Sequence, residues 1–421
     1  MENKNKNKNR LFGNIISLLV LQGSNYIFPL ITFPYLVRTL GTDNYGILVL
    51  CVATMQFLNI FVDYGFNISA TRDISINKYN NEKVNDIYNL IMTIKITLTL
   101  IVGIVFFIII ESLPFFNDSK VAFLISYFIL IGNTLFPIWL YQGLERMKYI
   151  TYINIIAKIL VTLLIFIFIR DSNDINIAVF FQTLYYIIPG IFSWFFVKVK
   201  FKIDYKFIID IHKITHELGK SKHIFLTNLW INFYIHGPLV ILGFISGNKA
   251  TGNYGISQKV MGAFIGLFQP VSQAVYPYLC ELYESNKKQF FLFKKKLLFL
   301  SFLFSILISL LLFIFSSQFS IIVTGTNNNE INQLIRVFSI IVFLAIMNTI
   351  MARIMYTMNL QKNLNKSYSI AAILFIILSV PLTIWLQEFG MAIAVILAEG
   401  IIFVLNIRNL IMVRRSRGEN I

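Results

Sequence analysis

The sequence predicts an all-α polytopic membrane protein whose twelve transmembrane helices form two six-helix lobes. The first observation behind this prediction is composition: 57% of the 421 residues are hydrophobic, 13% are charged, and the mean hydropathy is +0.72. A soluble protein of this length could not bury so much apolar surface. The second observation is an internal repeat, and the third is the spacing and flanking charge of the apolar segments.

The repeat relates the two halves of the chain. Pro29-Leu30 and Asn44-Tyr45-Gly46-Ile47 recur without a gap, 209 residues later, as Pro238-Leu239 and Asn253-Tyr254-Gly255-Ile256. In both copies a proline-containing apolar helix is followed by a short polar turn and the start of another apolar helix. Such a repeat inside a membrane protein is typical of a transporter whose two halves move around a central site.

Twelve apolar segments are long enough to cross roughly 30 Å of hydrocarbon. With both termini on one side, 27 of the 36 Lys and Arg residues lie on that side and 4 on the other. Because Lys and Arg favour cytoplasmic loops, we expect both termini in the cytoplasm. Six spans per half is an even number, so the halves share one orientation and a pseudo-two-fold axis along the membrane normal. The predicted spans are 12–37, 44–70, 87–110, 120–141, 149–169, 176–197, 223–246, 252–280, 297–318, 332–358, 366–386 and 390–411.

The longest cytoplasmic loop separates a first lobe (1–202) from a second (223–421). Within this linker (203–222), apolar residues recur at helical spacing with lysines between them, which predicts a basic amphipathic helix at the membrane surface. His212 and His216 lie beside Glu217 at a spacing that can hold a metal on a helix. Because no fourth ligand accompanies them, we expect a solvated face and no metal site.

Polar and ionisable side chains inside the spans predict a hydrated cavity, since such groups rarely face lipid. Five cations against two acids would make this cavity attract negative charge, above all phosphate. The residues predicted to line it are Lys95, Lys158, Lys259, Arg336, Arg353, Asn59, Asn67, Asn154 and Gln273. Arg336 and Arg353 lie near span ends, so snorkelling to the interface is an equal alternative for them.

The two acids within the spans are Asp63 and Glu399. Either could bind a coupling ion, H+ or Na+, during transport. Asp63 could equally hold the guanidinium of Arg72 or a lysine in one conformation, and the sequence leaves that choice open.

Prolines mark the helices that are candidates for bending during transport. Pro29 and Pro34 interrupt the first helix, and Pro238 interrupts its repeat partner. Each proline removes a backbone hydrogen bond and permits a bend, which neighbouring helices tolerate in a membrane. Matching prolines in both halves favour gating of the cavity, with static kinks as the alternative.

Two runs in the first third of the chain resemble those of the polysaccharide flippases. They are Pro29-Leu30-Ile31-Thr32 to Tyr45-Gly46, and Asp63-Tyr64-Gly65-Phe66-Asn67 to Ala70-Thr71-Arg72. The chain thus resembles the Wzx-type O-antigen exporters of the multidrug/oligosaccharidyl-lipid/polysaccharide (MOP) superfamily. The resemblance implies a MATE-like fold of two lobes and marks Asp63, Asn67 and Arg72 as motif positions.

The resemblance also implies a function. Such proteins move undecaprenyl-pyrophosphate-linked oligosaccharide units from the cytoplasmic to the outer leaflet of the bacterial inner membrane. We therefore expect a lipid-linked oligosaccharide and membrane lipids as partners, with a polysaccharide polymerase and a chain-length regulator as further candidates. No nucleic-acid partner and no cofactor beyond a coupling ion are expected.

Two other functions remain as alternatives. A MOP-fold exporter of lipid II or of drugs is the nearest, although a drug pump for cations would carry more acids in its cavity. A membrane polymerase or glycosyltransferase would need catalytic groups on a sizeable outer loop. The outer acids here are scattered over short segments, and no nucleophile–base pair or phosphate-binding glycine loop accompanies them. We therefore expect a transporter, not an enzyme.

Overall fold

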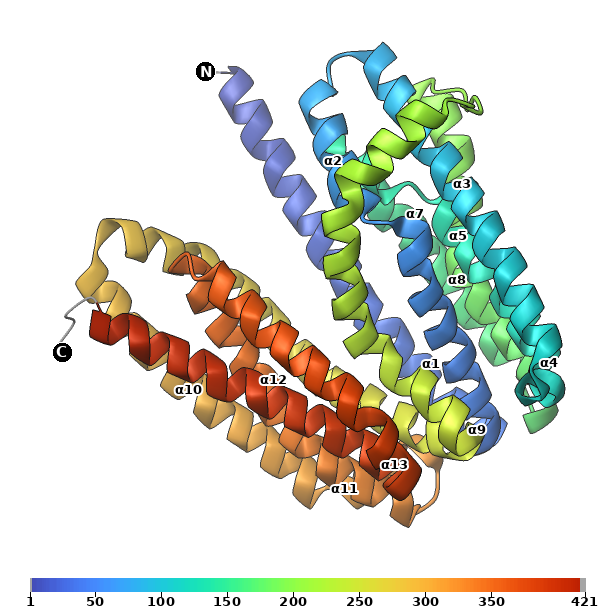
Figure 1. Ribbon diagram of the computed structural model, residues 1–421, viewed down its shortest axis with the longest axis vertical. Helices are drawn as coiled ribbons and strands as arrows, with labels where there is room; N and C mark the ends of the chain where they lie inside the picture. The colour runs from blue at the N-terminus through green and yellow to red at the C-terminus, as the bar shows by residue number, and fades with distance from the viewer. Residues whose placement is uncertain (1, 417–421) are drawn as a thin grey trace. The chain divides into compact units, whose positions relative to one another are not determined.

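The computed structural model describes the backbone of residues 2–416 and the side chains of 20–25, 27–230 and 232–412 (Figure 1). Throughout this part of the chain the regular structure is helical and contains no strand, which confirms the predicted all-α class. The first helices are α1 (Glu2–Asp63), α2 (Phe66–Asn77), α3 (Asn81–Ser112), η1 (Pro114–Ser119), α4 (Lys120–Ser126), α5 (Phe128–Leu135), α6 (Ile138–Gly143), α7 (Met147–Phe168), η2 (Ser172–Asp174) and α8 (Ile175–Phe201). They are followed by α9 (Ile211–Ser285), α10 (Lys287–Ile314), α11 (Ser316–Thr324), α12 (Asn329–Thr357) and α13 (Gln361–Ser416).

Three helices are too long to cross a membrane once. α1 has 62 residues and would extend about 93 Å if it were straight, roughly three times the thickness of the hydrocarbon. Each of the three is broken by a residue with positive φ: Gly41 in α1 (φ 77°), Gly247 in α9 (φ 80°) and Gln387 in α13 (φ 49°). Figure 1 shows the chain reversing direction at the breaks in α1 and α13. Each of these helices is therefore two arms joined by a tight turn.

The broken helices fall where the sequence predicts paired spans. Among the described residues, eight helical segments are long and apolar enough to cross a membrane, or nine if the bent α9 is included. Counting both arms of α1, α9 and α13 turns nine segments into twelve, which is consistent with the predicted number. The predicted fourth span is not one helix: it consists of α4, α5 and α6, with an extended Phe136 before Pro137. A residue before proline avoids the helical conformation, which explains that break.

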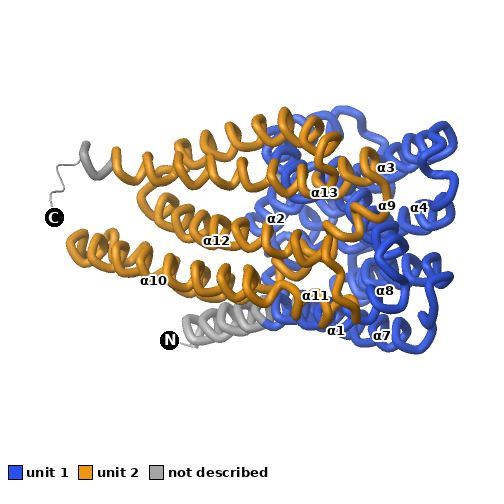
Figure 2. Tube along the Cα trace, turned by 90° about the horizontal axis from the view of Figure 1, so that it is seen from below, with its two compact units in different colours: residues 1–237 blue, residues 238–421 orange. Residues whose placement is uncertain are grey.

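The chain separates into two compact units, residues 1–237 and 238–421 (Figure 2). The predicted lobes instead meet at the linker 203–222. The difference arises because the linker and the first turns of the predicted seventh span pack with the first unit. In that unit α1 packs on α7, α2 on α6 and α5 on α8, whereas in the second unit α12 packs between α10 and α13.

The linker is only partly helical. Residues 202–210 are irregular, and the helix begins at Ile211 instead of near 203 as expected. Asp210 caps it, because its Oδ1 accepts a hydrogen bond from the Lys213 backbone N–H at 3.1 Å. That hydrogen bond also lowers the pKa of the Asp210 carboxyl. The irregular stretch is held by α3, where Asn89 Oδ1 accepts from the Lys206 N–H and Thr93 Oγ1 accepts from the Ile208 N–H.

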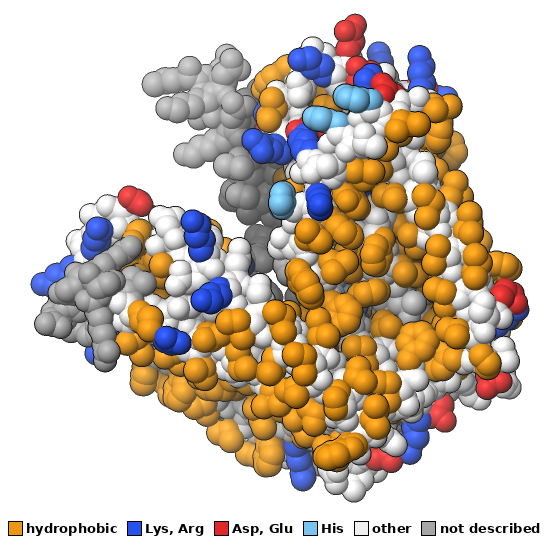
Figure 3. Space-filling model, viewed as in Figure 1, with side chains coloured by type: hydrophobic (Ala, Val, Ile, Leu, Met, Phe, Trp, Pro, Cys, Tyr) orange, Lys and Arg blue, Asp and Glu red, His pale blue; other side chains and the backbone are white. Residues whose placement is uncertain are grey.

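The distribution of apolar and charged side chains follows the course of the helices. On the face shown in Figure 3, hydrophobic side chains cover long stretches of the helices, while charged and histidine side chains gather near helix ends. Many large apolar side chains on α3, α7 and α10 are more than half exposed, including Ile104, Leu163 and Phe299. Exposed apolar belts of this kind suit helices that face lipid, and they agree with a multi-pass membrane protein.

Candidate functional site

An ion pair lies inside the first unit, near the end of α1. Lys95 Nζ of α3 donates to Asp63 Oδ1 at 3.2 Å, and Lys95 is only 3% exposed. Of the partners expected for Asp63, the structure therefore shows a lysine, and Arg72 is exposed on α2 instead. A buried pair of opposite charges is neutral as a whole, so in this arrangement Lys95 does not offer its charge to a ligand.

Polar side chains continue this region along α1. Gln56 donates to the Tyr186 hydroxyl at 2.9 Å, one turn before Asn59. The Asn59 Oδ1 atom is buried and has no hydrogen-bond partner. Gln56, Asn59 and Asp63, all in the predicted second span, therefore face the interior of the unit. Asn67 lies beyond the end of α1, on α2, and is exposed.

The residues after Asp63 form a packing site for the start of α9. Gly65 adopts φ 86° at the N-terminus of α2, and a Cβ on it would lie 2.7 Å from the Ile224 side chain. The Tyr64 ring stacks on Phe225 with centroids 4.4 Å apart. Ser221 Oγ donates to Ser69 Oγ at 2.9 Å. The run from Asp63 to Arg72 thus has a structural role, which is to hold the helix that follows the linker.

Lys158 of α7 reaches back to α1. Its Nζ donates to Ser24 Oγ at 3.2 Å and also to Asn25 Oδ1. No described carboxylate lies within ion-pairing distance of it. Lys158 is half-buried, so it is a positive charge with neutral partners at a position that an anion can reach. Asn154, one turn earlier, is also half-buried and donates to the backbone carbonyl of Ile150.

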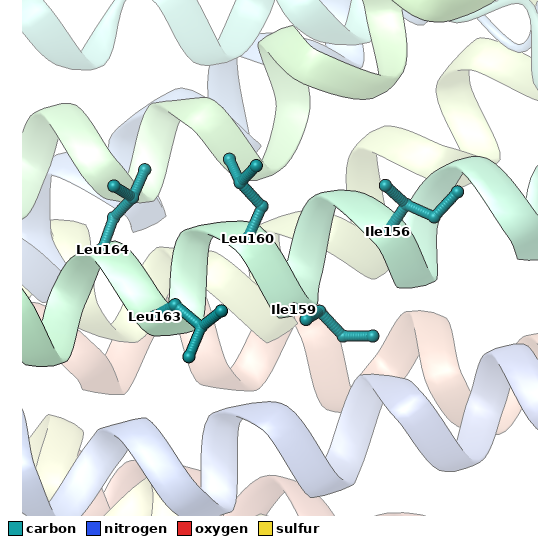
Figure 4. A pocket seen from close by; sticks show the side chains of 5 residues that line it. All are labelled: Ile156, Ile159, Leu160, Leu163 and Leu164. Carbon is teal, nitrogen blue, oxygen red and sulfur yellow. The ribbon is translucent and has the colours of Figure 1, made fainter.

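The opposite face of α7 is apolar. Five aliphatic side chains line a hollow of about 470 Å³ there: Ile156, Ile159, Leu160, Leu163 and Leu164 (Figure 4). At 100° per residue these positions cluster on one side of the helix, and Lys158 falls on the other. The hollow has no polar lining and cannot recognise a sugar or phosphate. It suits a hydrocarbon chain.

In the second unit two arginines are held, like Lys158, by neutral side chains. Arg336 Nε donates to Ser316 Oγ at 3.0 Å, and its guanidinium carbon lies 5.7 Å from the centre of the Phe313 ring. Arg353 Nε donates to Ser272 Oγ at 3.2 Å, and its guanidinium carbon lies 5.5 Å from the centre of the Tyr276 ring. Neither has a carboxylate within ion-pairing distance in the described part of the chain. Each is thus a fixed cation on an aromatic ring.

The other residues predicted in this half lie on α9 and α13. Lys259 is exposed and Gln273 is half-buried on α9. Glu399 of α13 accepts a hydrogen bond from Asn348 at 2.5 Å through Oε2, and a second from the same amide at 3.0 Å through its backbone carbonyl. Glu399 is therefore tied to α12, in the same helix pair that carries Arg353.

A polar clamp at the other end of the second unit was not expected from the sequence. The Asn253 amide donates to Glu330 Oε2 at 2.9 Å and to Glu388 Oε1 at 3.1 Å, and Lys249 pairs with Glu330 at 3.0 Å. In the first unit, the repeat equivalent Asn44 donates to the Ser172 carbonyl at 2.7 Å. Both amides therefore tie the early turn of their half to the start of its sixth predicted span. The repeat pointed to these two asparagines but not to their partners.

The predicted gating prolines lie inside helical arms. Pro29 and Pro34 are within the first arm of α1, and its non-helical residue is Gly41. Pro238 lies in α9, between a bend of 49° after Trp230 and the break at Gly247. Among the described side chains, no group of three or more His, Cys, Asp or Glu residues could hold a metal ion, and this includes the surroundings of His212 and His216.

Each unit carries cations that no described carboxylate neutralises. Lys158 in the first unit, and Lys259, Arg336 and Arg353 in the second, lack a carboxylate partner among the described residues, whereas Lys95 is neutralised by Asp63. Hydroxyl, amide and aromatic groups hold three of these four cations in place. Such groups orient a positive charge without cancelling it, which suits the binding of a phosphate or a carboxylate.

Comparison with known proteins identifies the family. A family model described as "Polysaccharide biosynthesis protein" matches residues 11–283. The chain belongs to this family. It is 35% identical over 400 residues to a protein of Escherichia coli (strain K12) named "Putative O-antigen transporter", a match that covers 94% of this chain and 96% of that one. A protein of the same name from Shigella dysenteriae is 28% identical over 396 residues, with 92% and 97% covered.

Solved structures agree on the fold. The lipid II flippase MurJ in an inward closed conformation is similar with a TM-score of 0.68 at 13% identity, covering 95% of this chain and 87% of that chain. An inward-facing MATE transporter of the MOP superfamily is similar with a TM-score of 0.59, also at 13% identity, covering 93% and 98%. The expected MATE-like fold is thus confirmed.

Proposed function

We propose that this protein is a flippase for lipid-linked oligosaccharide units of a bacterial surface polysaccharide. The observation that carries the proposal is the likeness to a protein named as an O-antigen transporter over nearly the full length of both chains. The four cations without carboxylate partners support it, because a pyrophosphate-linked substrate is strongly anionic at neutral pH. The exposed aliphatic hollow on α7 suits a polyprenyl tail that stays in lipid.

The proposed mechanism separates the two ends of the substrate. The pyrophosphate and sugars would be held by Lys158, Lys259, Arg336 and Arg353, with Asn59, Asn154 and Gln273 as polar neighbours. The lipid tail would remain outside the polar cavity. The two units would alternate in exposing the cavity to the cytoplasmic and outer leaflets of the inner membrane. Both termini would face the cytoplasm, in keeping with the bias of Lys and Arg.

Ion coupling is part of the proposal. Asp63 and Glu399 are the acids within spans, and each carboxylate accepts a contact that proton or sodium binding could break: the Lys95 ammonium for Asp63 and the Asn348 amide for Glu399. Either H+ or Na+ would serve as the coupling ion. A polysaccharide polymerase and a chain-length regulator are the proposed functional partners, since they would use the delivered units.

The experiment is a deletion strain whose lipids are extracted and whose surface glycan is examined by gel and mass spectrometry. We expect undecaprenyl-pyrophosphate-linked repeat units to accumulate and the surface polymer to be lost. Single repeat units at the surface would instead indicate a polymerase. Accumulated lipid II would favour a lipid II exporter of the same fold, and an unchanged profile would favour drug export.

A further inference from the structure

A group of aromatic side chains surrounds Arg353 in the second unit, and the proposed function does not use it. Tyr276 of α9 lies under the guanidinium, and Tyr356 follows Arg353 by one turn on α12. Tyr368 of α13 lies within electrostatic range of Arg353, Tyr356 and Glu399. We call Tyr276, Arg353, Tyr356 and Tyr368 the Arg353 cluster. Three helices contribute to it, so it depends on the folded unit and not on one stretch of sequence.

The guanidinium in this cluster is fixed by one hydrogen bond and by the Tyr276 ring. Ser272, which accepts from Arg353 Nε, is fully buried, so this contact anchors the arginine to the core of α9. An arginine has five N–H groups, and this hydrogen bond uses one of them. Arg353 is half-buried and no described carboxylate neutralises it. The remaining N–H groups therefore suit an incoming oxyanion, which arginine binds through two parallel hydrogen bonds.

Two of the tyrosines in the cluster are partly accessible. Tyr356 is 38% exposed and Tyr368 is 40% exposed. A tyrosine presents a rigid apolar ring face together with a hydroxyl that can donate or accept a hydrogen bond. A hexose ring has the matching character, with C–H groups on its face and hydroxyls around its edge.

We propose that the Arg353 cluster binds the phosphate-linked end of the glycan, with Arg353 on the phosphate and Tyr356 and Tyr368 against the first sugars. This inference rests on the proposed function and refines it, because it assigns the sugar-reading part of the site to the second unit. Tyr276 positions the guanidinium from below. The tyrosines contribute recognition of the sugar, and the arginine contributes recognition of the charge.

The test compares two probes on the purified full-length protein in lipid nanodiscs. One probe is undecaprenyl pyrophosphate, and the other is the same lipid carrying N-acetylglucosamine. We expect the wild type to bind the sugar-bearing probe about three- to tenfold more tightly than the bare one, which is the effect of one or two aromatic contacts. Tyr356→Leu and Tyr368→Leu should reduce that ratio to about one without changing affinity for the bare lipid. The corresponding Phe variants should keep most of the ratio, since they retain the ring face.

Arg353→Gln should weaken binding of both probes by about tenfold or more, because it removes a charge-assisted contact to phosphate. The control is Tyr278→Leu: Tyr278 is on the same helix as Tyr276 and 47% exposed, and its ring packs on Phe293 instead. It should leave the ratio unchanged. A melting temperature for each variant shows that it is folded.

The outcomes separate the inference from the proposed function. Equal binding of both probes by the wild type, or an unchanged ratio in the Leu variants, would overturn the Arg353 cluster as a sugar site and leave the tyrosines as an interfacial belt. Failure of the wild type to bind either probe would count against the flippase proposal itself.

Discussion

Among single residues, Lys158 is a cation that the structure holds in place without neutralising it. Its ammonium is held by Ser24 and Asn25, which orient it without neutralising it. Lys95 differs, because Asp63 cancels its charge inside the unit. Two lysines that the sequence placed in the same class therefore have different surroundings, and their variants should have different effects.

We expect Lys158→Ala to reduce glycan export by about 10- to 100-fold, the usual effect of losing a hydrogen bond to a charged group. Insertion into the membrane should be normal, because no carboxylate loses its partner. Surface glycan and the amount of protein in membranes would be measured together in a complemented deletion strain. Lys213→Ala is the control, since its side chain is 66% exposed on the linker. Normal export by the Lys158→Ala protein would contradict the role given to Lys158.

The Asp63–Lys95 pair should reveal itself through stability. Lys95→Met leaves the Asp63 carboxylate buried and unpaired, which costs about 3–5 kcal/mol in comparable pairs. Asp63→Asn with Lys95→Met should recover most of that loss, because no charge then remains buried. Thermal unfolding of the purified variants in detergent would show the difference. If the double variant were as unstable as Lys95→Met, the pair would not be the source of the effect.

The sequence predicted which residues carry charge into the membrane but not what they contact. Helical spacing places Asp63 on a polar stripe, yet it gives no depth and no neighbour from α3, so Arg72 and a lysine were equally good partners. The clamp of Asn253 on Glu330 and Glu388 joins residues 77 and 135 positions apart, which no local pattern can connect. The fold class was easier to predict, because composition, span length and each copy of the repeat are patterns of residues near one another in sequence.

At the scale of elements, glycines with positive φ set the turns within α1 and α9. Gly41 and Gly247 have φ of 77° and 80°. The two halves do not place this glycine identically, since it precedes the repeated asparagine by three residues in one half and by six in the other. The gapless repeat therefore describes the helices that follow the turns better than the turns themselves.

Gly41→Ala should destabilise the protein by about 1–3 kcal/mol, because the Gly41 conformation (φ 77°, ψ 169°) lies in a region that is essentially restricted to glycine. Space is not the reason, because nothing lies within 4 Å of a Cβ added there. Gly23→Ala is a matched control in the same helix: its added Cβ also meets nothing within 4 Å, and no positive φ is recorded for it. It should be neutral or stabilising by up to about 1 kcal/mol. Equal melting temperatures for the two variants would contradict this account of the turn.

The start of α9 behaves in the structure as part of the first unit. The linker helix was predicted to begin near 203, but residues 203–210 hydrogen-bond to α3 through Asn89 and Thr93 instead. Amphipathic spacing cannot distinguish a helix from an extended segment whose N–H groups already have partners. The contacts of Ser221 and Phe225 with the residues after Asp63 complete this attachment.

A disulfide tests whether that attachment persists during transport. Ser69→Cys with Ser221→Cys places two thiols where the hydroxyl oxygens are 2.9 Å apart, so oxidation should link them efficiently. We expect the linked protein to retain at least about half of its export, because both residues move with one unit. Cross-linking would be measured by cleaving the protein in the linker and recording the change in mobility of a fragment on a gel. Loss of export that a reductant restores would show that α9 leaves the first unit during the cycle.

At the scale of the molecule, the repeat gives each half one proline-containing helix next to its turn. Replacing both Pro29 and Pro238 with Ala restores a backbone donor in each helix and should stiffen both. We expect turnover to fall several-fold more than substrate affinity, because a gate affects rate and not binding. Export rate and probe binding would be compared in the same preparation. Equal losses of rate and affinity would count against gating by these helices.

The central claim is that this chain moves a lipid-linked oligosaccharide across a bilayer. The most direct measurement uses proteoliposomes that contain the purified protein and the lipid accumulated by the deletion strain. An enzyme that modifies sugars and cannot cross membranes reports which leaflet the glycan occupies. We predict that an imposed proton or sodium gradient transfers inner-leaflet glycan to the accessible outer leaflet with wild-type protein and not with Lys158→Ala. If the accessible fraction stayed at one half, under either gradient or none, the proposed function would be contradicted.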